Sequence, residues 1–249
     1  MQPLQGRVAV VTGSANNIGR ATALMLSGQG AAVMVHAKQN QAGADETKAL
    51  IEKAGGKAAV HLADLTTEAG AKSLMDATVA AFGRLDILIN NAAVRRNTPF
   101  LEMTLEEFHF VMANSLDCAF LCARFAMPHM VAGKWGRIVN IGGITAARGT
   151  AGRVHVGAAK SAMIGMTRSL AREFGKDGVT VNIIAPGAVD TKRGTAAGAR
   201  PKDAVDRDCV VGRDATVDEI AHMITMLCHP NGASTTGQTI HVNGGTYFN

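Results

Sequence analysis

The sequence predicts an α/β domain in which helices cover both faces of a parallel sheet. Apolar runs without alternation, such as residues 8–11 and 87–89, are typical of strands buried on both sides. Helical stretches separate these runs along the chain, and repeated strand–helix units require right-handed crossovers. The 249 residues, 47% of them hydrophobic and only 4% aromatic, suit close packing of helices on a sheet. We therefore expect a single doubly wound domain over residues 1–249, with a seven-stranded parallel sheet flanked by helices.

The first strand, residues 7–12, leads into a glycine turn from Gly13 to Gly19 and then into a helix rich in Ala and Leu. Glycine lets a ligand approach the backbone closely, because no Cβ stands in the way. The free N–H groups and the positive dipole end of the helix that follows favour a phosphate. This opening therefore predicts a nucleotide site, and the rest of the chain has to supply the remaining contacts.

The later elements alternate in the same way. A strand at 31–35 precedes a helix at 41–53, and a strand at 58–62 precedes a helix at 68–82. After the strand at 87–89, a long helix follows Thr104, where Glu107 completes a capping-box pattern, and runs to about residue 130. Strands at 136–141 and 179–185 flank a helix at 155–174, and a helix at 217–227 precedes a last strand at 239–242. The stretch 188–212 follows the C-terminal end of a strand, so we expect a substrate lid there.

Charge and cysteine content narrow the class of protein. A net charge of +5 without a Lys/Arg block argues against nucleic-acid binding and suits anionic cofactors or substrates. The four cysteines (Cys118, Cys122, Cys209 and Cys228) form no Cys-x-x-Cys pair, so we expect reduced core side chains and no metal site. We expect neither a signal peptide nor an apolar run of membrane-spanning length, and hence a soluble cytoplasmic protein.

Several motifs in a fixed order carry a specific resemblance. They are Thr12-Gly13-x-x-x-Asn17-Ile18-Gly19, Asp64, Asn90-Asn91-Ala92-Ala93, Lys160, Pro186-Gly187 and the ending Thr236-Gly237-Gln238-x-Ile240-x-Val242-x-Gly244-Gly245. With them the whole chain resembles the short-chain dehydrogenase/reductase family. The resemblance implies a nicotinamide dinucleotide held by Gly13, Ser14, Asn16, Asn17, Ile18, Gly19, His36, Lys38, Asp64, Leu65, Asn91, Ala92, Ala93, Lys160, Pro186, Gly187, Val189 and Thr191.

The resemblance also implies individual roles within that set. Asp64 contacts the adenine, while the alternative interpretation is an acid at a helix N-terminus, and both can hold. Asn91 supports the central strand beside the cofactor. Pro186-Gly187 and Thr191 contact the nicotinamide amide and the phosphate.

Two departures from the family pattern concern the cofactor. Asn17 stands where the family usually has a glycine, but Asn tolerates a left-handed φ, so the turn can still form. The second strand ends in His36-Ala37-Lys38, without the acid that binds the ribose hydroxyls in NAD-specific members. Lys38, helped by His36, can pair with a 2′-phosphate. We therefore expect NADP(H) in preference to NAD(H).

The catalytic positions depart further from the family, which uses a tyrosine, a lysine, a serine and an asparagine. Lys160 is present, but Val156 stands at the tyrosine position and Gly143 at the serine position. Ser115 aligns with the asparagine, and Asn114 comes one residue early, a slip that rotates a helical side chain by roughly 100 degrees unless the helix carries a bulge. Valine and glycine can neither donate a proton nor polarise an oxygen, so standard carbonyl reduction is in doubt.

Other polar groups near the expected pocket offer replacements. Arg95, Arg96, Arg148 and Arg153 can bind a carboxylate, phosphate or phenolate, although each can equally be a surface or subunit-contact residue. His155 can move a proton near neutral pH, although its helical position points it roughly 100 degrees away from that of Val156. Ser115 can hold a water or simply fill space. Lys160, Ser115 and His155 are thus the candidate catalytic residues.

Three functions remain open. The first is an NADP(H)-dependent oxidoreductase with a rearranged site, acting on an anionic or activated substrate. The second is a non-catalytic nucleotide-binding homologue or a subunit of a mixed oligomer. The third is a non-redox lyase, dehalogenase or hydrolase, which the retained cofactor motifs argue against. The resemblance further implies a homodimer or homotetramer that pairs through the helices near residues 106–130 and 155–174.

Overall fold

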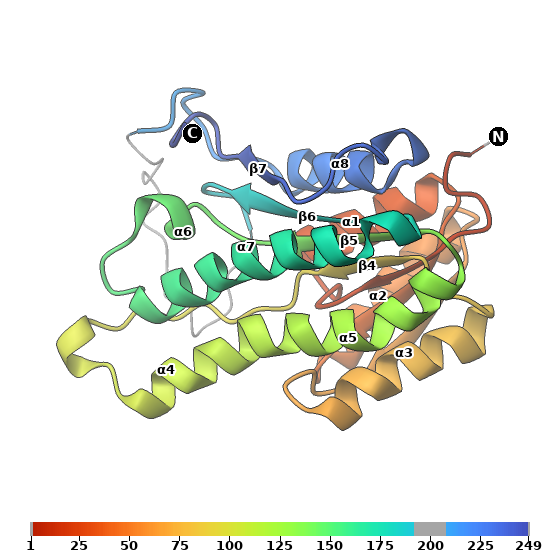
Figure 1. Cartoon of the computed structure of the whole chain (residues 1–249), viewed down its shortest axis with the longest axis horizontal. Coiled ribbons are helices and arrows are strands. Elements are labelled where there is room, and N and C mark those ends of the chain that lie inside the picture. The colour runs from red at the N-terminus through yellow and green to blue at the C-terminus, as the bar shows by residue number, and fades with distance from the viewer. Residues whose placement is uncertain (1, 192–207, 249) are drawn as a thin grey trace.

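Seven parallel strands form the centre of the computed structural model, which describes residues 2–191 and 208–248 (Figure 1). Their order is β3-β2-β1-β4-β5-β6-β7, so the direction of winding reverses between β1 and β4. In such sheets ligands bind at the carboxyl ends of the strands beside this reversal. The strands are β1 Val8–Val11, β2 Ala32–Ala37, β3 Ala58–Leu62, β4 Ile87–Asn90, β5 Gly136–Ile141, β6 Val179–Pro186 and β7 Thr239–Val242. The expected doubly wound fold is confirmed.

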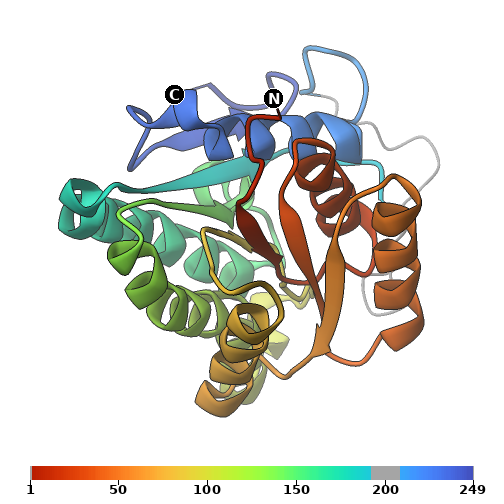
Figure 2. The same ribbon diagram turned by 90° about the vertical axis from the view of Figure 1, so that its right-hand side faces the viewer.

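Helices cover both faces of this sheet, as the view in Figure 2 shows. α1, α2 and α8 lie on one face, and α3, α5 and α7 lie on the other. The helices are α1 Asn17–Gly28, α2 Gln41–Lys53, α3 Glu68–Phe82, α4 Leu105–Met112, α5 Cys118–Ala132, α6 Thr145–Arg148, α7 Val154–Phe174 and α8 Val217–Cys228. Short 3₁₀ turns occupy Phe100–Glu102, Gly175–Asp177 and Pro230–Gly232.

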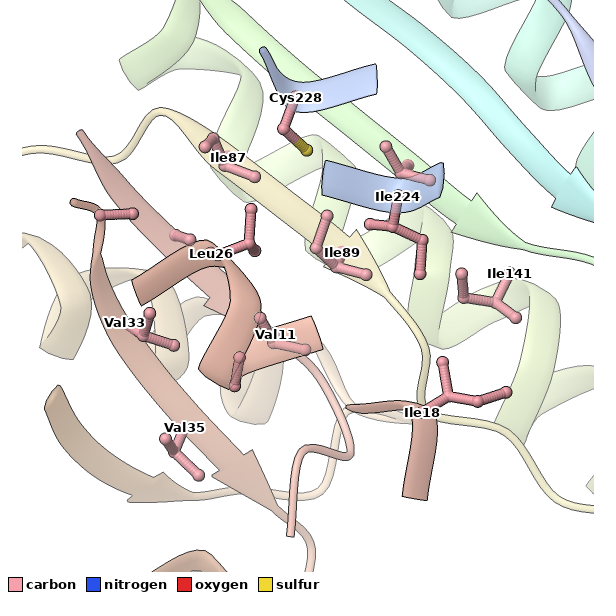
Figure 3. Close-up of a cluster of buried hydrophobic side chains, with 14 of the residues drawn as sticks. Val11, Ile18, Leu26, Val33, Val35, Ile87, Ile89, Ile141, Ile224 and Cys228 are labelled. Carbon is pink, nitrogen blue, oxygen red and sulfur yellow. The ribbon is translucent and has the colours of Figure 1, made fainter. Parts of the chain in front are cut away.

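The core beneath α1 and α8 shows why the central strands β1 and β4 are rich in β-branched apolar residues. Val11 of β1 and Ile89 of β4 are fully buried between Leu26 of α1 and Ile224 of α8 (Figure 3). Branched side chains pack well on a pleated surface. The opposite face of the same strands has its own buried cluster under α3 and α5. The sheet is therefore a rigid platform that ends in the loops of the candidate site.

The long helix expected after Thr104 is interrupted. Residues Ala113–Asp117 form a π-helix between α4 and α5, which is the bulge on which the placement of Asn114 depended. At its start the Thr104 hydroxyl accepts a hydrogen bond from the Glu107 N–H at 3.1 Å. The Glu107 carboxylate instead accepts one from Thr98 Oγ1 at 2.6 Å, so only half of the expected capping box forms as predicted.

One helical segment is apolar over a membrane-spanning length, contrary to the expectation from the sequence. The segment Leu105–Ala132 is long and apolar enough to cross a membrane by length and composition, with a mean hydropathy of 1.3 over an 18-residue window. Half of that window is buried inside the fold. Three of the cysteines, Cys118, Cys122 and Cys228, are buried core residues as expected, whereas Cys209 is only partly buried.

The expected lid at 188–212 lies largely outside the described residues, because 192–207 are not among them. At its described ends, Val189 forms a parallel bridge with Ala215. Arg148 Nη1 also donates to Asp208 Oδ2 at 3.0 Å. One described end thus lies beside the segment that precedes α8, and the other beside α6.

Candidate functional site

The glycine turn after β1 brings its backbone close to the strands beside it. Gly13 has φ +63°, and a Cβ there would lie 3.1 Å from Ala92 Cα. A Cβ on Gly19 would collide with the Gly13 carbonyl and stand 2.7 Å from Asn91 Nδ2. Asn17 takes φ 46°, which confirms that Asn replaces the usual glycine in a left-handed conformation. The turn therefore keeps the tight form that lets a phosphate approach α1.

Asn91, just beyond β4, ties this turn to the centre of the sheet. Its Nδ2 donates to Thr12 O at 2.9 Å and to Gly13 O at 3.0 Å. The Thr12 hydroxyl accepts in return from the N–H groups of Asn91 and Ala92. Asn91 thus lies where the resemblance placed it. Thr12 thus supports the segment after β4, a role that its place in the glycine motif did not predict.

His36 at the end of β2 supports the turn from the other side. Its Nδ1 accepts from Gly13 N at 3.1 Å, and its Nε2 lies 3.0 Å from Ala63 O. The ring is 2% exposed, and burial lowers its pKa to about 4. A neutral, buried ring with both nitrogens occupied has no donor left for a 2′-phosphate. The predicted phosphate contact of His36 is therefore corrected to a structural role under Gly13.

Lys38 and Asp64, at the ends of β2 and β3, face each other across the site. Lys38 Nζ is 2.7 Å from Asp64 Oδ2, and this hydrogen bond is the main cause that lowers the pKa of Asp64 to about 2. Both side chains are about half exposed. Asp64 Oδ1 also accepts from Thr66, while Thr67 caps α3. Asp64 therefore precedes the helix without capping it, and its neighbour Leu65 is buried in the core.

Lys160 projects from α7 to the carboxyl end of β5. Its Nζ donates to Ile141 O at 2.6 Å and lies 3.8 Å from Met163 Sδ. The side chain is almost wholly buried, and desolvation lowers the pKa of the amine to about 8. Gly143 lies two residues beyond Ile141, and a Cβ built on it meets no atom within 4 Å. The place of the missing serine is therefore open space.

The π-helix decides between Asn114 and Ser115. Ser115 is 1% exposed, and its Oγ has no hydrogen-bond partner among the described residues. Asn114 is partly exposed and bonds back to Phe110 O at 2.9 Å. Ser115 is thus the residue that faces inward, and its carbonyl accepts from the Cys118 thiol at 3.4 Å. Cys118, expected as a core side chain, lies three residues from Ser115 and shares its helix face.

His155 is buried at the start of α7, beside α4. Its side chain is fully buried, Nδ1 accepts from Val156 N at 3.0 Å, and Nε2 lies 3.7 Å from Glu107 Oε1 on α4. Glu107 is itself held by Thr98 of the stretch after β4. His155 therefore links α7 to α4, and its predicted role as the proton-moving group of the pocket stays a prediction.

The four predicted substrate arginines do not share one environment. Arg95 is exposed, and Arg96 stacks on the Phe110 ring at 4.3 Å with Glu107 nearby. Arg148 pairs with Asp208. Arg153 is partly buried, and its Nε is shielded from solvent without a hydrogen-bond partner in the described part of the chain.

Pro186 and Gly187 end β6 beside the same edge. The Pro186 carbonyl accepts from Ile144 N at 3.0 Å, and a Cβ on Gly187 would lie 2.9 Å from Asn243 Cα. Val189 packs against the core, and Thr191 is the last described residue before the gap. The ends of β1, β4, β5 and β6 thus bring the predicted cofactor residues to one edge of the sheet.

Comparison with known proteins finds relatives that match almost the whole chain. The family described as "Enoyl-(Acyl carrier protein) reductase" matches residues 13–247. A 2,3-dihydroxy-2,3-dihydro-p-cumate dehydrogenase of Pseudomonas putida is 39% identical over 98% of this chain and 95% of its own length. The 3-oxoacyl-(acyl-carrier-protein) reductase FabG of Escherichia coli is 33% identical, with 98% of both chains covered.

Solved structures agree with these sequence matches. A doubly substituted short-chain dehydrogenase/reductase of Serratia marcescens superposes with a TM-score of 0.90 at 32% identity, over 98% of this chain and 99% of its own. A dehydrogenase/reductase from Sinorhizobium meliloti gives 0.90 at 33% identity, over 98% and 96%.

Proposed function

The chain belongs to the short-chain dehydrogenase/reductase family, and from that premise we propose that it is an NADP(H)-dependent oxidoreductase with a non-standard active site. The observation that carries the proposal is a dinucleotide cradle kept intact beside a catalytic position left empty. The dinucleotide cradle is formed by Gly13, Gly19 and Asn91. The catalytic position is empty because Val156 and Gly143 replace the tyrosine and the serine of the family.

The residues present fit a dinucleotide. A Cβ would fill the approach to the turn at Gly19, and the carboxyl ends of the central strands converge there. The bound nicotinamide would supply or accept a hydride. The chain's own residues would bind and orient it: the glycine turn at the phosphates, Asp64 at the adenine, and Lys160 with Pro186-Gly187 at the nicotinamide half.

Lys38 supports NADP(H) as the cofactor. It is half exposed at the end of β2, so its ammonium is accessible to an anion, and its ion pair with Asp64 is of the exposed kind that contributes little stability. A 2′-phosphate can therefore compete for this lysine without a large cost to the fold. No acid stands at residues 36–38 to bind free ribose hydroxyls.

The open catalytic position favours substrates that need little help from an acid. Activated enones, quinones and iminium-like species accept a hydride without a strong hydrogen bond at the oxygen. Arg95 and Arg153 add positive charge near this end of the sheet, which suits an anionic substrate. The dihydrodiol and 3-oxoacyl names of the relatives indicate ring and acyl ketones or alcohols as the first compounds to test.

The test begins with binding. Titration of the protein with NADPH and NADH is expected to give tighter binding of NADPH, and tighter binding of NADH would contradict the cofactor assignment. NADPH oxidation is then measured on a panel of activated and anionic carbonyls, enones and quinones. The Val156→Tyr/Gly143→Ser double variant serves as the positive control for a working cofactor site. If the double variant turns over a simple carbonyl and the natural chain oxidises NADPH with no panel compound, the chain is a non-catalytic dinucleotide-binding homologue.

The remaining parts of the proposal concern context. We propose a homodimer or homotetramer in the cytoplasm. In support, Phe110 and Phe120 are large apolar side chains exposed along the α4–α5 face. Size-exclusion chromatography with light scattering tests the oligomer, and a monomer at micromolar concentration would contradict it.

A further inference from the structure

Reduction of a carbonyl needs a proton as well as a hydride, and the usual donor is absent here. Val156 stands at the tyrosine position, and the chain's only tyrosine, Tyr247, follows β7 and stacks with His241. His155 is buried against Glu107 of α4. The Ser115 hydroxyl is neutral and a far weaker acid than an ammonium group. Among the described residues, Lys160 offers an ionisable proton donor at the carboxyl end of β5.

The lysine and the empty position adjoin each other on two elements. Val156 and Lys160 are four residues apart on α7, so they lie one turn apart on the same helix face. The bond from Nζ to Ile141 O places the ammonium at the strand end from which Gly143 continues. The side chain of Val156 stops at its methyl groups, and a Cβ on Gly143 would meet open space. The path from Nζ toward this space is therefore not filled by an aromatic ring.

We propose that Lys160 Nζ is itself the acid and base of the reaction, exchanging its proton with the substrate oxygen between Val156 and Gly143, directly or through one water. The inference rests on the proposed oxidoreductase function. In the reductive direction the substrate carbon gains the hydride that the reduced nicotinamide supplies, the Nζ–H bond breaks and an O–H bond forms. Lys160 is left as a neutral amine and regains its proton from water.

The surroundings of the amine suit this role. Among the described residues its hydrogen-bond partners are the Ile141 carbonyl and the Met163 thioether, which use at most two of its three N–H bonds. Burial lowers the pKa of Lys160 to about 8, and Arg95 acts in the same direction. Cys118 is the other titratable group that acts on the amine, and burial raises the pKa of its thiol to about 11, so the thiol stays neutral. An acid with a pKa close to the working pH transfers protons efficiently.

The pH dependence follows from this assignment. Reduction requires the ammonium form, so its rate at saturating NADPH should fall as pH rises through about 8. Oxidation requires the neutral amine, so its rate should rise over the same interval.

The experiment compares the natural chain with Lys160→Met, Lys160→Arg and a matched surface control, Lys176→Met. NADPH affinity is measured first by titration, because Lys160 would also contact the ribose. At saturating NADPH, kcat of Lys160→Met should fall by ~10²- to 10⁴-fold, and its pH limb near 8 should disappear. Added ethylammonium should restore part of the rate in Lys160→Ala. Lys160→Arg, which keeps the charge but cannot release a proton near neutral pH, should bind NADPH and remain slow.

Two results would overturn the inference while leaving the proposed function intact. One is Lys160→Met with unchanged kcat at saturating NADPH and only weaker binding. The other is a rate independent of pH between 7 and 9 in the natural chain. If the natural chain shows no turnover on the whole panel, the proposed function fails instead. Competitive acylation of lysines read by mass spectrometry then tests Lys160 directly, and titration above pH 10 would overturn the inference on its own.

Discussion

Acidification is expected to destabilise the fold through His36, the buried support of the glycine turn. Its Nδ1 must stay unprotonated to accept the Gly13 N–H, and burial lowers its folded-state pKa from 6.5 to about 4. The unfolded chain therefore binds a proton near pH 6.5 that the folded chain refuses until near pH 4. The stability due to neutral His36 is complete above pH 6.5 and is lost as pH falls toward 4.

The size of the effect follows from that difference. A gap of about 2.5 pKa units corresponds to about 3.4 kcal/mol in full, and to about 2 kcal/mol by pH 5. Urea unfolding at pH 7.5 and pH 5 should therefore show that the natural chain loses about 2 kcal/mol more than His36→Asn, whose amide oxygen keeps an acceptor near Gly13. NADPH affinity should fall over the same interval in the natural chain, because the turn loses its support.

His61 provides the matched control. It stands opposite His36 on the neighbouring strand, is less buried, and bonds Ser73 at the molecular edge. His61→Gln should keep most of the pH dependence of the natural chain, because burial is the main cause of the lowered pKa of His36 and the charge of His61 is a lesser one. If His36→Asn and the natural chain lose equal stability between the two pH values, the argument from burial of His36 is refuted.

The remaining predictions concern the two halves of the site. Gly19→Ala places a methyl group against the Gly13 carbonyl, and calorimetry should show at least ~100-fold weaker NADPH binding with about 1–3 kcal/mol lost in urea unfolding; wild-type affinity would contradict the tight turn. Lys38→Gln should weaken NADPH about tenfold with NADH unchanged, and should alter stability by less than about 1 kcal/mol because its ion pair is exposed; an equal loss for both cofactors would exclude a 2′-phosphate contact. Val156→Tyr with Gly143→Ser should raise NADPH-dependent reduction of a simple ketone about 100-fold, since open space surrounds Gly143; no gain would show that the pocket itself is displaced.

Local pattern determined much of this protein. Apolar runs and the helices between them predicted seven parallel strands, because burial on both faces favours apolar residues, although β5 also buries Arg137 and Asn140. The glycine turn could equally be predicted from the sequence. Gly13 takes a left-handed φ, and Gly19 stands where a Cβ would collide with the Gly13 carbonyl. The absence of the serine at position 143 and of the tyrosine at position 156 could be predicted from the register of the motifs that surround these positions.

Tertiary structure decided what each polar side chain near the site does. His36 and Lys38 are two residues apart, yet one is buried under Gly13 and the other half exposed against Asp64. Residues two apart along a strand point to the same face, so alternation alone does not distinguish them. Their different exposure comes from the packing of β3 and of the glycine turn around them. His155 likewise depends on Glu107, which lies on a different helix.

The π-helix at Ala113–Asp117 is the clearest case of this limit. A single extra residue in a turn leaves no distinct sequence signal. The π-helix packs against α7, which is distant in the sequence. It turns Ser115 inward and leaves Asn114 on the surface side. The sequence by itself thus determined the sheet, the cofactor cradle and the missing groups. Contacts between distant elements decided which of the remaining polar side chains point into the fold and which point to the surface.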